Sequence, residues 1–202
     1  MEYWRTQKQA RLNGMETTGQ QQRDCYIYFG PTGCGKTTLV KENTLGEGKS
    51  LYTKSGENKW WCGYDDHETI LMDEFKGNIS LEHFNDITNK GIQQVECKGG
   101  MALLSADEIH IASNTHPIHW WKGRDGDDVS WRDPRYQAVA RRIKRIYHWC
   151  RDGTLLQITP DNPKWRQWWD GPQKTYRIEN PGQKVFEQTI NETQDYFDFI
   201  LH

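Results

Sequence analysis

Eight residues, Gly-Pro-Thr-Gly-Cys-Gly-Lys-Thr from Gly30 to Thr37, match the pattern G-x-x-x-x-G-K-[ST] in full. An apolar, aromatic run at 26–29 with the composition of a β-strand precedes them, and 38–42 can continue as a helix. A strand that leads through a glycine-rich loop into a helix is typical of phosphate-binding sites. This feature predicts an α/β domain with the loop at one edge of its sheet.

The residue types in this loop suit a nucleoside triphosphate. Glycines let the backbone approach the phosphates, so that successive N–H groups form an anion-binding nest, and the helix adds its positive N-terminal end. Lys36 can reach the β- and γ-phosphates, and the Thr37 hydroxyl can ligate Mg²⁺. The residues predicted to bind the nucleoside triphosphate are Gly30, Pro31, Thr32, Gly33, Cys34, Gly35, Lys36, Thr37 and Thr38.

A second apolar run ends in two acids. Residues 69–72 read Thr-Ile-Leu-Met, and Asp73 and Glu74 follow them. Ligands of open α/β sheets bind at the carboxyl ends of the strands, so Asp73 is predicted to hold Mg²⁺ and Glu74 to act as general base on water. An acid that activates water favours a hydrolase over a kinase, which needs an acceptor pocket.

The rest of the chain alternates between strand and helix patterns. Strands are predicted near 50–53, 94–97, 101–104, 108–113 and 143–149, and helices after the N-cap residues Ser80 and Asp133. The link Lys98-Gly99-Gly100 suggests a hairpin. The pattern predicts an α/β P-loop NTPase with a largely parallel sheet flanked by helices. We expect it to span 23–150, between an N-terminal helical segment (1–22) and a C-terminal extension (151–202) of unknown role.

Composition excludes several other classes. The 26 basic and 28 acidic residues give a net charge of −2, which argues against coating nucleic acid by bulk positive charge. The charges are segregated, because 65–86 holds seven acids and one lysine while 135–151 holds six basic residues and no acid. No apolar run approaches the roughly 20 residues of a membrane span.

Cysteine and tryptophan carry two further expectations. The five cysteines include no Cys-x-x-Cys pair and indicate reduced thiols. Ten tryptophans include the adjacent pairs Trp60-Trp61, Trp120-Trp121 and Trp168-Trp169. Packing is the expected role of such bulk, and stacking of the first two pairs on single-stranded bases is the alternative.

Six stretches in order, 30–37, 59–64, 70–75, 95–100, 111–114 and 138–143, together resemble the superfamily 3 helicases. The chain is most similar to the helicase domain of replication-associated proteins from circular single-stranded DNA viruses of the circovirus type, over about 25–150. The resemblance implies an AAA+-like, ATP- and Mg²⁺-dependent DNA helicase that acts in rolling-circle replication. It also implies a hexameric ring on single-stranded DNA in the host nucleus, with other replication proteins as possible partners and no membrane.

The same resemblance assigns roles to individual residues. Asn114, at the end of a strand, is the polar sensor of the γ-phosphate. Lys98, with Gly99 and Gly100, forms a loop that contacts DNA phosphates in a central channel. Arg142, or its neighbour Arg141, is the arginine finger that one subunit inserts into the next subunit's site. The segment 1–22 resembles the family's oligomerisation helix.

The sequence departs from full-length members of that family in one respect. No two histidines are separated by one residue and no tyrosine has lysine at +3, so the signatures of the origin-nicking endonuclease are missing. We therefore expect the helicase part alone. Two alternative functions stay open: a P-loop kinase with a small acceptor, in which Arg141 and Arg142 act within one subunit, and an RNA-directed P-loop ATPase.

Overall fold

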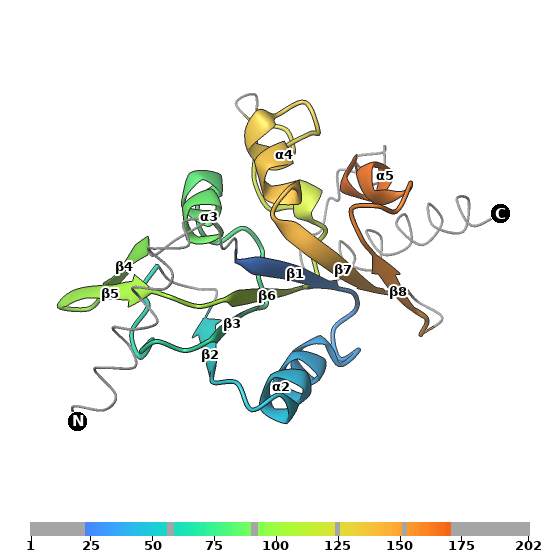
Figure 1. Ribbon diagram of the computed structural model, residues 1–202. Coiled ribbons are helices and arrows are strands. Elements are labelled where there is room, and N and C mark those ends of the chain that lie inside the picture. Colours follow the sequence, from blue (N-terminus) through green and yellow to red (C-terminus); the bar gives the residue numbers. More distant parts are fainter. Residues whose placement is uncertain (1–22, 56–58, 90–92, 124–125, 151–152, 171–202) are drawn as a thin grey trace.

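A six-stranded sheet organises the part of the chain that the computed structural model describes, residues 23–55, 59–89, 93–123, 126–150 and 153–170 (Figure 1). The strands lie in the order β2-β3-β6-β1-β7-β8. Their bounds are β1 Asp24–Phe29, β2 Leu51–Ser55, β3 Thr69–Asp73, β6 Glu108–Ser113, β7 Ile143–Trp149 and β8 Leu155–Ile158. The expected N-terminal helix in 1–22 lies outside the described residues.

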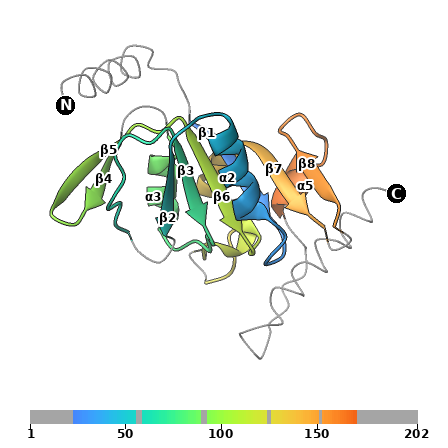
Figure 2. The same ribbon diagram turned by 90° about the horizontal axis from the view of Figure 1, so that it is seen from below.

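Helices cover both faces of this sheet. Helix α2 (Lys36–Gly46) lies on one face, and α3 (Leu81–Ile87), α4 (Pro134–Ala140) and α5 (Trp165–Asp170) lie on the other (Figures 1 and 2). Neighbouring strands from β2 to β7 are parallel, and β8 alone runs antiparallel to its neighbour β7. The predicted α/β class, with a largely parallel sheet flanked by helices, is confirmed.

Local sequence signals account for two of these helices. The Ser80 side chain accepts a hydrogen bond from the backbone N–H of His83 and caps α3. Asp133 accepts one from the N–H of Arg135 and caps α4, with Pro134 at the first helical position. The two helices present their apolar residues to the same face of the sheet, so the predicted caps set which side chains enter the core.

The paired tryptophans are packing residues for the most part. Trp61, Trp120, Trp121, Trp168 and Trp169 are all buried, at 0 to 7% exposure, in the core cluster shared by the sheet and the α3–α5 layer. Trp60 is partly exposed, with the Lys59 ammonium 4.6 Å from its ring centroid. Packing, the expected role, is confirmed for these five rings, and Trp120 and Trp121 offer no free face for bases.

The packed unit does not end at residue 150, where the sequence analysis places the boundary. Strand β8 pairs with β7, with Ile158 opposite Ile146, and the Tyr136 hydroxyl donates to the Trp169 carbonyl at 2.9 Å. Trp168 and Trp169 bury 99% or more of their surface. A four-residue strand and a six-residue helix between prolines carry little periodic pattern, so only their long-range packing reveals them.

A separate two-stranded hairpin projects beyond the β2 edge (Figure 1). It comprises β4 (Gln93–Cys97) and β5 (Gly100–Leu104), as predicted. Cys97 pairs with Gly100, so the turn is only Lys98-Gly99, and Gly100 is the first residue of β5 rather than part of the loop. Gly99, the second turn residue, has φ 86°, a left-handed conformation that glycine adopts without steric cost. None of the helices in the described ranges has the length and apolar character needed to cross a bilayer.

Candidate nucleotide-binding site

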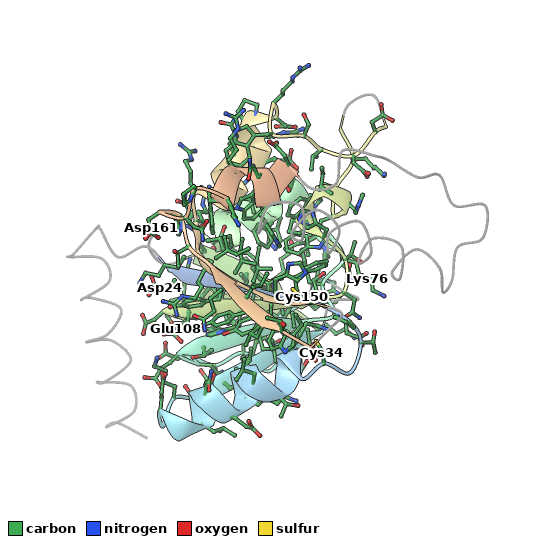
Figure 3. All side chains as sticks on the ribbon, turned by 90° about the vertical axis from the view of Figure 1, so that its right-hand side faces the viewer. Asp24, Cys34, Lys76, Glu108, Cys150 and Asp161 are labelled. Atoms are coloured by element: carbon green, nitrogen blue, oxygen red, sulfur yellow. The ribbon has the colours of Figure 1, made fainter. Side chains whose placement is uncertain are left out.

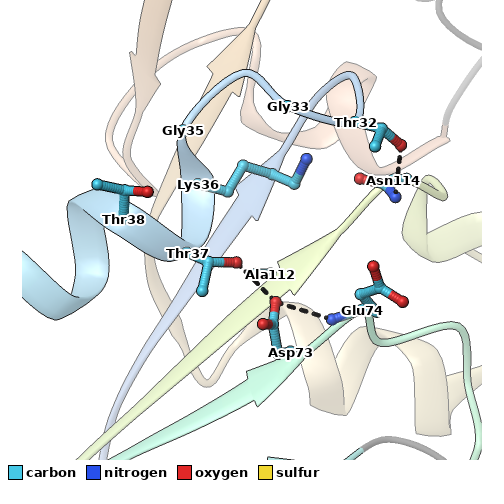
Figure 4. Close-up of a pocket in the computed structure, with 10 residues that line it drawn as sticks. All are labelled: Thr32, Gly33, Gly35, Lys36, Thr37, Thr38, Asp73, Glu74, Ala112 and Asn114. Atoms are coloured by element: carbon cyan, nitrogen blue, oxygen red, sulfur yellow. Dashed lines mark hydrogen bonds between the residues drawn. The ribbon is translucent and has the colours of Figure 1, made fainter.

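The carboxyl ends of three adjacent strands converge on one cavity. The loop 30–35 leaves β1 and enters α2, an acidic pair ends β3, and Asn114 follows β6 (Figure 4). The cavity has a volume of about 200 Å³. Its lining residues are Thr32, Gly33, Gly35, Lys36, Thr37, Thr38, Asp73, Glu74, Ala112 and Asn114. Strands β1, β6 and β3 are parallel and end at the same edge of the sheet. Residues as far apart in the chain as Gly30 and Asn114 therefore meet at one place.

The loop's backbone conformation requires glycine. Gly33 has φ 81° and Gly35 has φ 95°, in the left-handed region that other residues avoid. A Cβ at either position would meet no protein atom within 4 Å, so open space lies beside both. The loop therefore has the shape of a cradle whose concave side is free for phosphate oxygens.

Lys36 lies inside this cradle. Its side chain is 7% exposed, and its ammonium donates to the carbonyls of Gly30 at 2.9 Å and Pro31 at 2.7 Å. Burial lowers the pKa of Lys36 below its ordinary value, while the nearby Cys34 thiol and the acids act in the opposite direction. The loop carbonyls accept hydrogen bonds from the Lys36 ammonium. A phosphate would be a stronger acceptor for the same ammonium, because a phosphate carries full charge.

Thr37 and Asp73 could supply two oxygen ligands to a metal ion. The Thr37 hydroxyl donates to Asp73 Oδ1 at 2.7 Å, which joins the start of α2 to the end of β3. A hydroxyl and a carboxylate are hard oxygen ligands, and Mg²⁺ needs only one or two protein groups beside phosphate oxygens and water. The described residues contain no group of three or more His, Cys, Asp or Glu that could hold a metal unaided. The pair fits Mg²⁺ that arrives with a triphosphate.

Glu74 has an unusual backbone conformation. Its φ of 49° is left-handed, one of two such values among the described non-glycine residues, and its N–H donates to Asp73 Oδ1 at 3.1 Å. Such a conformation is strained for glutamate and persists only where neighbours hold it. The N–H of the fully buried Phe75 donates to the Ala112 carbonyl at 2.9 Å and supplies that anchor. The turn directs the Glu74 carboxylate toward the cavity (Figure 4).

Asn114 faces Glu74 across the cavity (Figure 4). Its side-chain amide donates to Thr32 Oγ1 of the loop at 3.1 Å, so the end of β6 and the phosphate loop are joined directly. In this position the amide can donate to or accept from a group at the terminal phosphate without adding charge beside the two acids.

Two residues that the sequence analysis missed position this half of the site. The fully buried Ser113 hydroxyl lies 2.6 Å from the Phe75 carbonyl and 2.7 Å from the Thr115 carbonyl. The Trp120 indole N–H donates to Ser113 Oγ at 3.2 Å and to the Thr115 carbonyl at 2.8 Å. This network ties the residue before Asn114 to the residue after Glu74. No spacing in the sequence links these positions.

The two candidate arginine fingers lie at the opposite end of the sheet. Arg142 precedes β7 and donates to Asn85 Oδ1 at 3.2 Å and to the Ala138 carbonyl at 2.5 Å, while Arg141 is exposed. Burial lowers the pKa of Arg142, and the charge of Arg141 adds to the effect. Seven residues of β7 span about 20 Å. Neither arginine lines the cavity, and the length of the strand keeps both from reaching it within one subunit.

The predicted DNA-contacting residues form a second, separate location. Lys98, Gly99 and Gly100 are exposed at the tip of the β4–β5 hairpin and do not line the cavity. The backbone N–H of Lys98 donates to the Cys62 thiol at 3.2 Å, and the Trp61 N–H donates to the Glu96 carbonyl at 2.8 Å. These contacts hold the turn end of the hairpin against Trp61 and Cys62 and leave the exposed Lys98 side chain in solvent.

A parallel sheet with a phosphate-binding loop after β1 and an acidic pair after β3 defines the class as a P-loop NTPase-like α/β domain. A family model described as RNA helicase matches residues 26–116. The chain is similar to replication-associated proteins of Porcine circovirus 1 (32% identity, 70% of this chain) and Canary circovirus (30%, 72% of this chain). It is also similar to that of Goose circovirus (32% identity, 73% of this chain).

With the fold and the site, these matches identify the chain as a superfamily 3 helicase domain of the kind found in circovirus replication-associated proteins. The chain spans less than half the length of the three relatives, 44%, 47% and 43% in the same order.

Proposed function

We propose that this domain hydrolyses ATP with Mg²⁺ and uses the energy to move along single-stranded DNA. It would be the motor of a viral replication initiator in rolling-circle replication, acting in the host nucleus beside other replication proteins. One observation carries the proposal. Lys36, the Thr37–Asp73 pair, Glu74 and Asn114 come from three strand ends and surround a single cavity of about 200 Å³.

The residues divide the chemistry among them. Loop N–H groups and the Lys36 ammonium bind the phosphates and stabilise the charge that develops on the leaving group. Glu74 accepts a proton from the attacking water, and the Asn114 amide orients that water against the γ-phosphate. Mg²⁺ held by Thr37 and Asp73 would neutralise charge on the β- and γ-oxygens.

The positions of the two arginines support an assembly of several copies. Because Arg141 and Arg142 lie at the far end of β7, either of them could complete a site only in a neighbouring subunit. The acidic segment 65–86 contains the metal-binding Asp73, and the basic segment 135–151 contains both arginines. A head-to-tail ring, hexameric in the related helicases, would place unlike charges together at each interface.

The exposed hairpin supports nucleic acid as the polymer along which the domain moves. Lys98 is exposed on a two-residue turn, which suits contact with a passing phosphate backbone. A kinase is less well supported, because Arg141 and Arg142 lie too far from the cavity to act within one subunit and the cavity includes Glu74, an acid suited to activating water.

The test is steady-state ATPase activity without nucleic acid, with single-stranded DNA and with single-stranded RNA of the same sequence. We expect DNA to stimulate turnover more than RNA. The Lys36→Ala variant should be inactive, and Glu74→Gln should bind ATP but hydrolyse it poorly. Lys41→Ala, which removes an exposed lysine of α2, is the matched control and should keep full activity.

Each alternative predicts another outcome. Stimulation by RNA alone would identify an RNA-directed ATPase, and a rate indifferent to both nucleic acids would favour a kinase. Normal turnover in Lys36→Ala would remove the phosphate loop from the reaction.

A further inference from the structure

The described cavity has room and chemistry for phosphates but none for a base. Of its ten lining residues, Ala112 is the only one with a purely hydrocarbon side chain, and the rest are glycine, hydroxyl, amide or charged residues. Sites for drug-sized ligands are usually larger, about 300 to 1,000 Å³, and mostly apolar. The nucleoside of a bound nucleotide must therefore lie outside this cavity of about 200 Å³.

The order of the strands determines on which side the nucleoside emerges. Asp73, Glu74 and Asn114, which handle the terminal phosphate, belong to β3 and β6. Both strands lie on one side of β1, and β7 lies on the other side. A phosphate chain whose terminal group points toward β3 and β6 therefore directs its nucleoside toward the end of β7.

Trp149 is the residue at that end. A Cβ built on Gly30, the first glycine of the loop, would lie 2.7 Å from Trp149 Cβ and 3.2 Å from the Trp149 carbonyl oxygen. The two segments of the backbone are therefore in contact. The Trp149 indole packs on the α2 side of the sheet, with its ring centroid 6.3 Å from that of Tyr28, and it stays partly exposed.

Leu155 enlarges this apolar surface. It is the β8 residue directly opposite Trp149, so both side chains lie on the same face of the sheet. Leu155 is 38% exposed and one of four large hydrophobic side chains recorded as exposed in the described residues. An indole and a leucine with free surface thus lie immediately beside a loop whose own lining is polar.

We propose that Trp149, flanked by Leu155, is the surface on which the base of the bound nucleotide stacks. The inference rests on the proposed nucleotide site and adds its substrate class. Stacking on an indole uses the π-face that every base has, so it discriminates little between adenine and guanine. Purines present a larger face than pyrimidines, so the site takes purine nucleotides generally and pyrimidine nucleotides more weakly.

The experiment compares ligands that share phosphates and differ in the base. Titration calorimetry in Mg²⁺ buffer measures ADP, GDP, CDP and inorganic pyrophosphate, none of which the chain would consume as an ATPase. The variants are Trp149→Ala, which keeps the Cβ that touches Gly30, and Trp149→Phe, which keeps an aromatic face. Tyr147→Ala is the matched control, because it removes a ring from the same face of β7 two residues further from the loop.

Trp149→Ala should weaken ADP and GDP about ten-fold, which corresponds to about 1.4 kcal/mol, and leave pyrophosphate within about two-fold. Trp149→Phe should keep most of the ADP affinity, and Tyr147→Ala all of it. Equal weakening of ADP and pyrophosphate by Trp149→Ala, or no weakening of ADP, would overturn the inference. If the unaltered chain bound neither ADP nor pyrophosphate, the proposed function itself would fail.

Discussion

Two histidines buried beneath the nucleotide site should make the fold sensitive to mild acid. His116 is fully buried and His148 is 1% exposed. The Phe29 ring lies between them, with centroid distances of 5.6 Å and 4.9 Å. Phe29 directly precedes Gly30 of the phosphate loop, and His116 follows Asn114 by two residues, so a change at these rings is transmitted to both sides of the site.

Burial keeps both histidines neutral in the folded chain. It lowers the pKa of His148 from 6.5 to about 3. It also lowers the pKa of His116 well below 6.5, and the charges of His119 and His148 add to that effect. Either imidazole can take a proton near pH 6 only if the chain around it opens.

The sign of the effect follows from proton counts. Below pH 6.5 the unfolded chain binds more protons than the folded chain, so the free energy of unfolding falls as the pH falls. For His148 the loss extends from pH 6.5 down to its folded pKa of about 3. At pH 5 it amounts to about 2 kcal/mol, and the lowered pKa of His116 adds a loss of the same sign.

Carboxylates contribute at lower pH. Hydrogen bonding to His110, assisted by Lys49, lowers the pKa of Glu108 from 4.5 to about 2 despite its desolvation. Because its folded pKa is depressed, the stability that Glu108 supplies is lost only as the pH falls below 4.5. The interval from pH 6.5 to 5 therefore lies above the range in which Glu108 contributes.

Urea unfolding at pH 7, 6 and 5, followed by tryptophan fluorescence, measures the effect. The unaltered chain should lose at least about 2 kcal/mol between pH 7 and 5, which is the contribution of His148 alone. His148→Gln should be less stable at pH 7 yet lose about 2 kcal/mol less than the unaltered chain on acidification. His83→Gln, at a partly exposed position of α3, is the control and should keep the original slope. Stability that is constant from pH 7 to 5, or equal slopes for His148→Gln and the unaltered chain, would refute the reasoning.

Three further predictions concern single positions. Gly77→Ala should destabilise the fold by about 4 kcal/mol or more, because its Cβ would lie 1.7 Å from the Trp120 carbonyl oxygen. Gly63→Ala, at φ 88° with its nearest neighbour 3.9 Å away, is the control and should cost only about 1 kcal/mol. Thermal melts compare the two variants, and equal melting temperatures would contradict a role for the Trp120 contact. Arg142→Ala and Lys36→Ala chains, each inactive alone, should regain part of the ATPase activity when mixed; a mixture without activity would argue against a finger from the neighbour. Lys98→Ala should keep its basal ATPase rate but lose strand unwinding in a fluorescent duplex assay, and normal unwinding would contradict the role of the hairpin.

The local parts of the site could be predicted from the sequence. The glycine pattern of 30–37 specifies a loop conformation, and that conformation is fixed by residues adjacent in the chain. The run 69–72 and its acidic pair could be placed at a strand end, since parallel strands share one carboxyl edge. The caps Ser80 and Asp133 act within one helical turn and were equally readable.

Other features depend on contacts between distant parts of the chain. Ser113 joins the Phe75 carbonyl to the Trp120 indole, and Trp149 touches Gly30 across 119 positions, but neither pair follows a spacing that a helix or a strand imposes. Strand β8 and helix α5 likewise belong to the packed unit through long-range contacts, namely the pairing of β8 with β7 and the burial of Trp168 and Trp169.

The sequence by itself determined the phosphate loop, the acidic pair and the positions of the core strands along the chain, because backbone conformation and hydrophobic periodicity are local properties. Only the tertiary structure decided which residues hold Glu74 and Asn114 in place, that both candidate fingers lie far from their own cavity, and that an indole borders the loop. Packing selects those neighbours by shape and hydrogen bonding, and neither is encoded at a fixed distance along the chain.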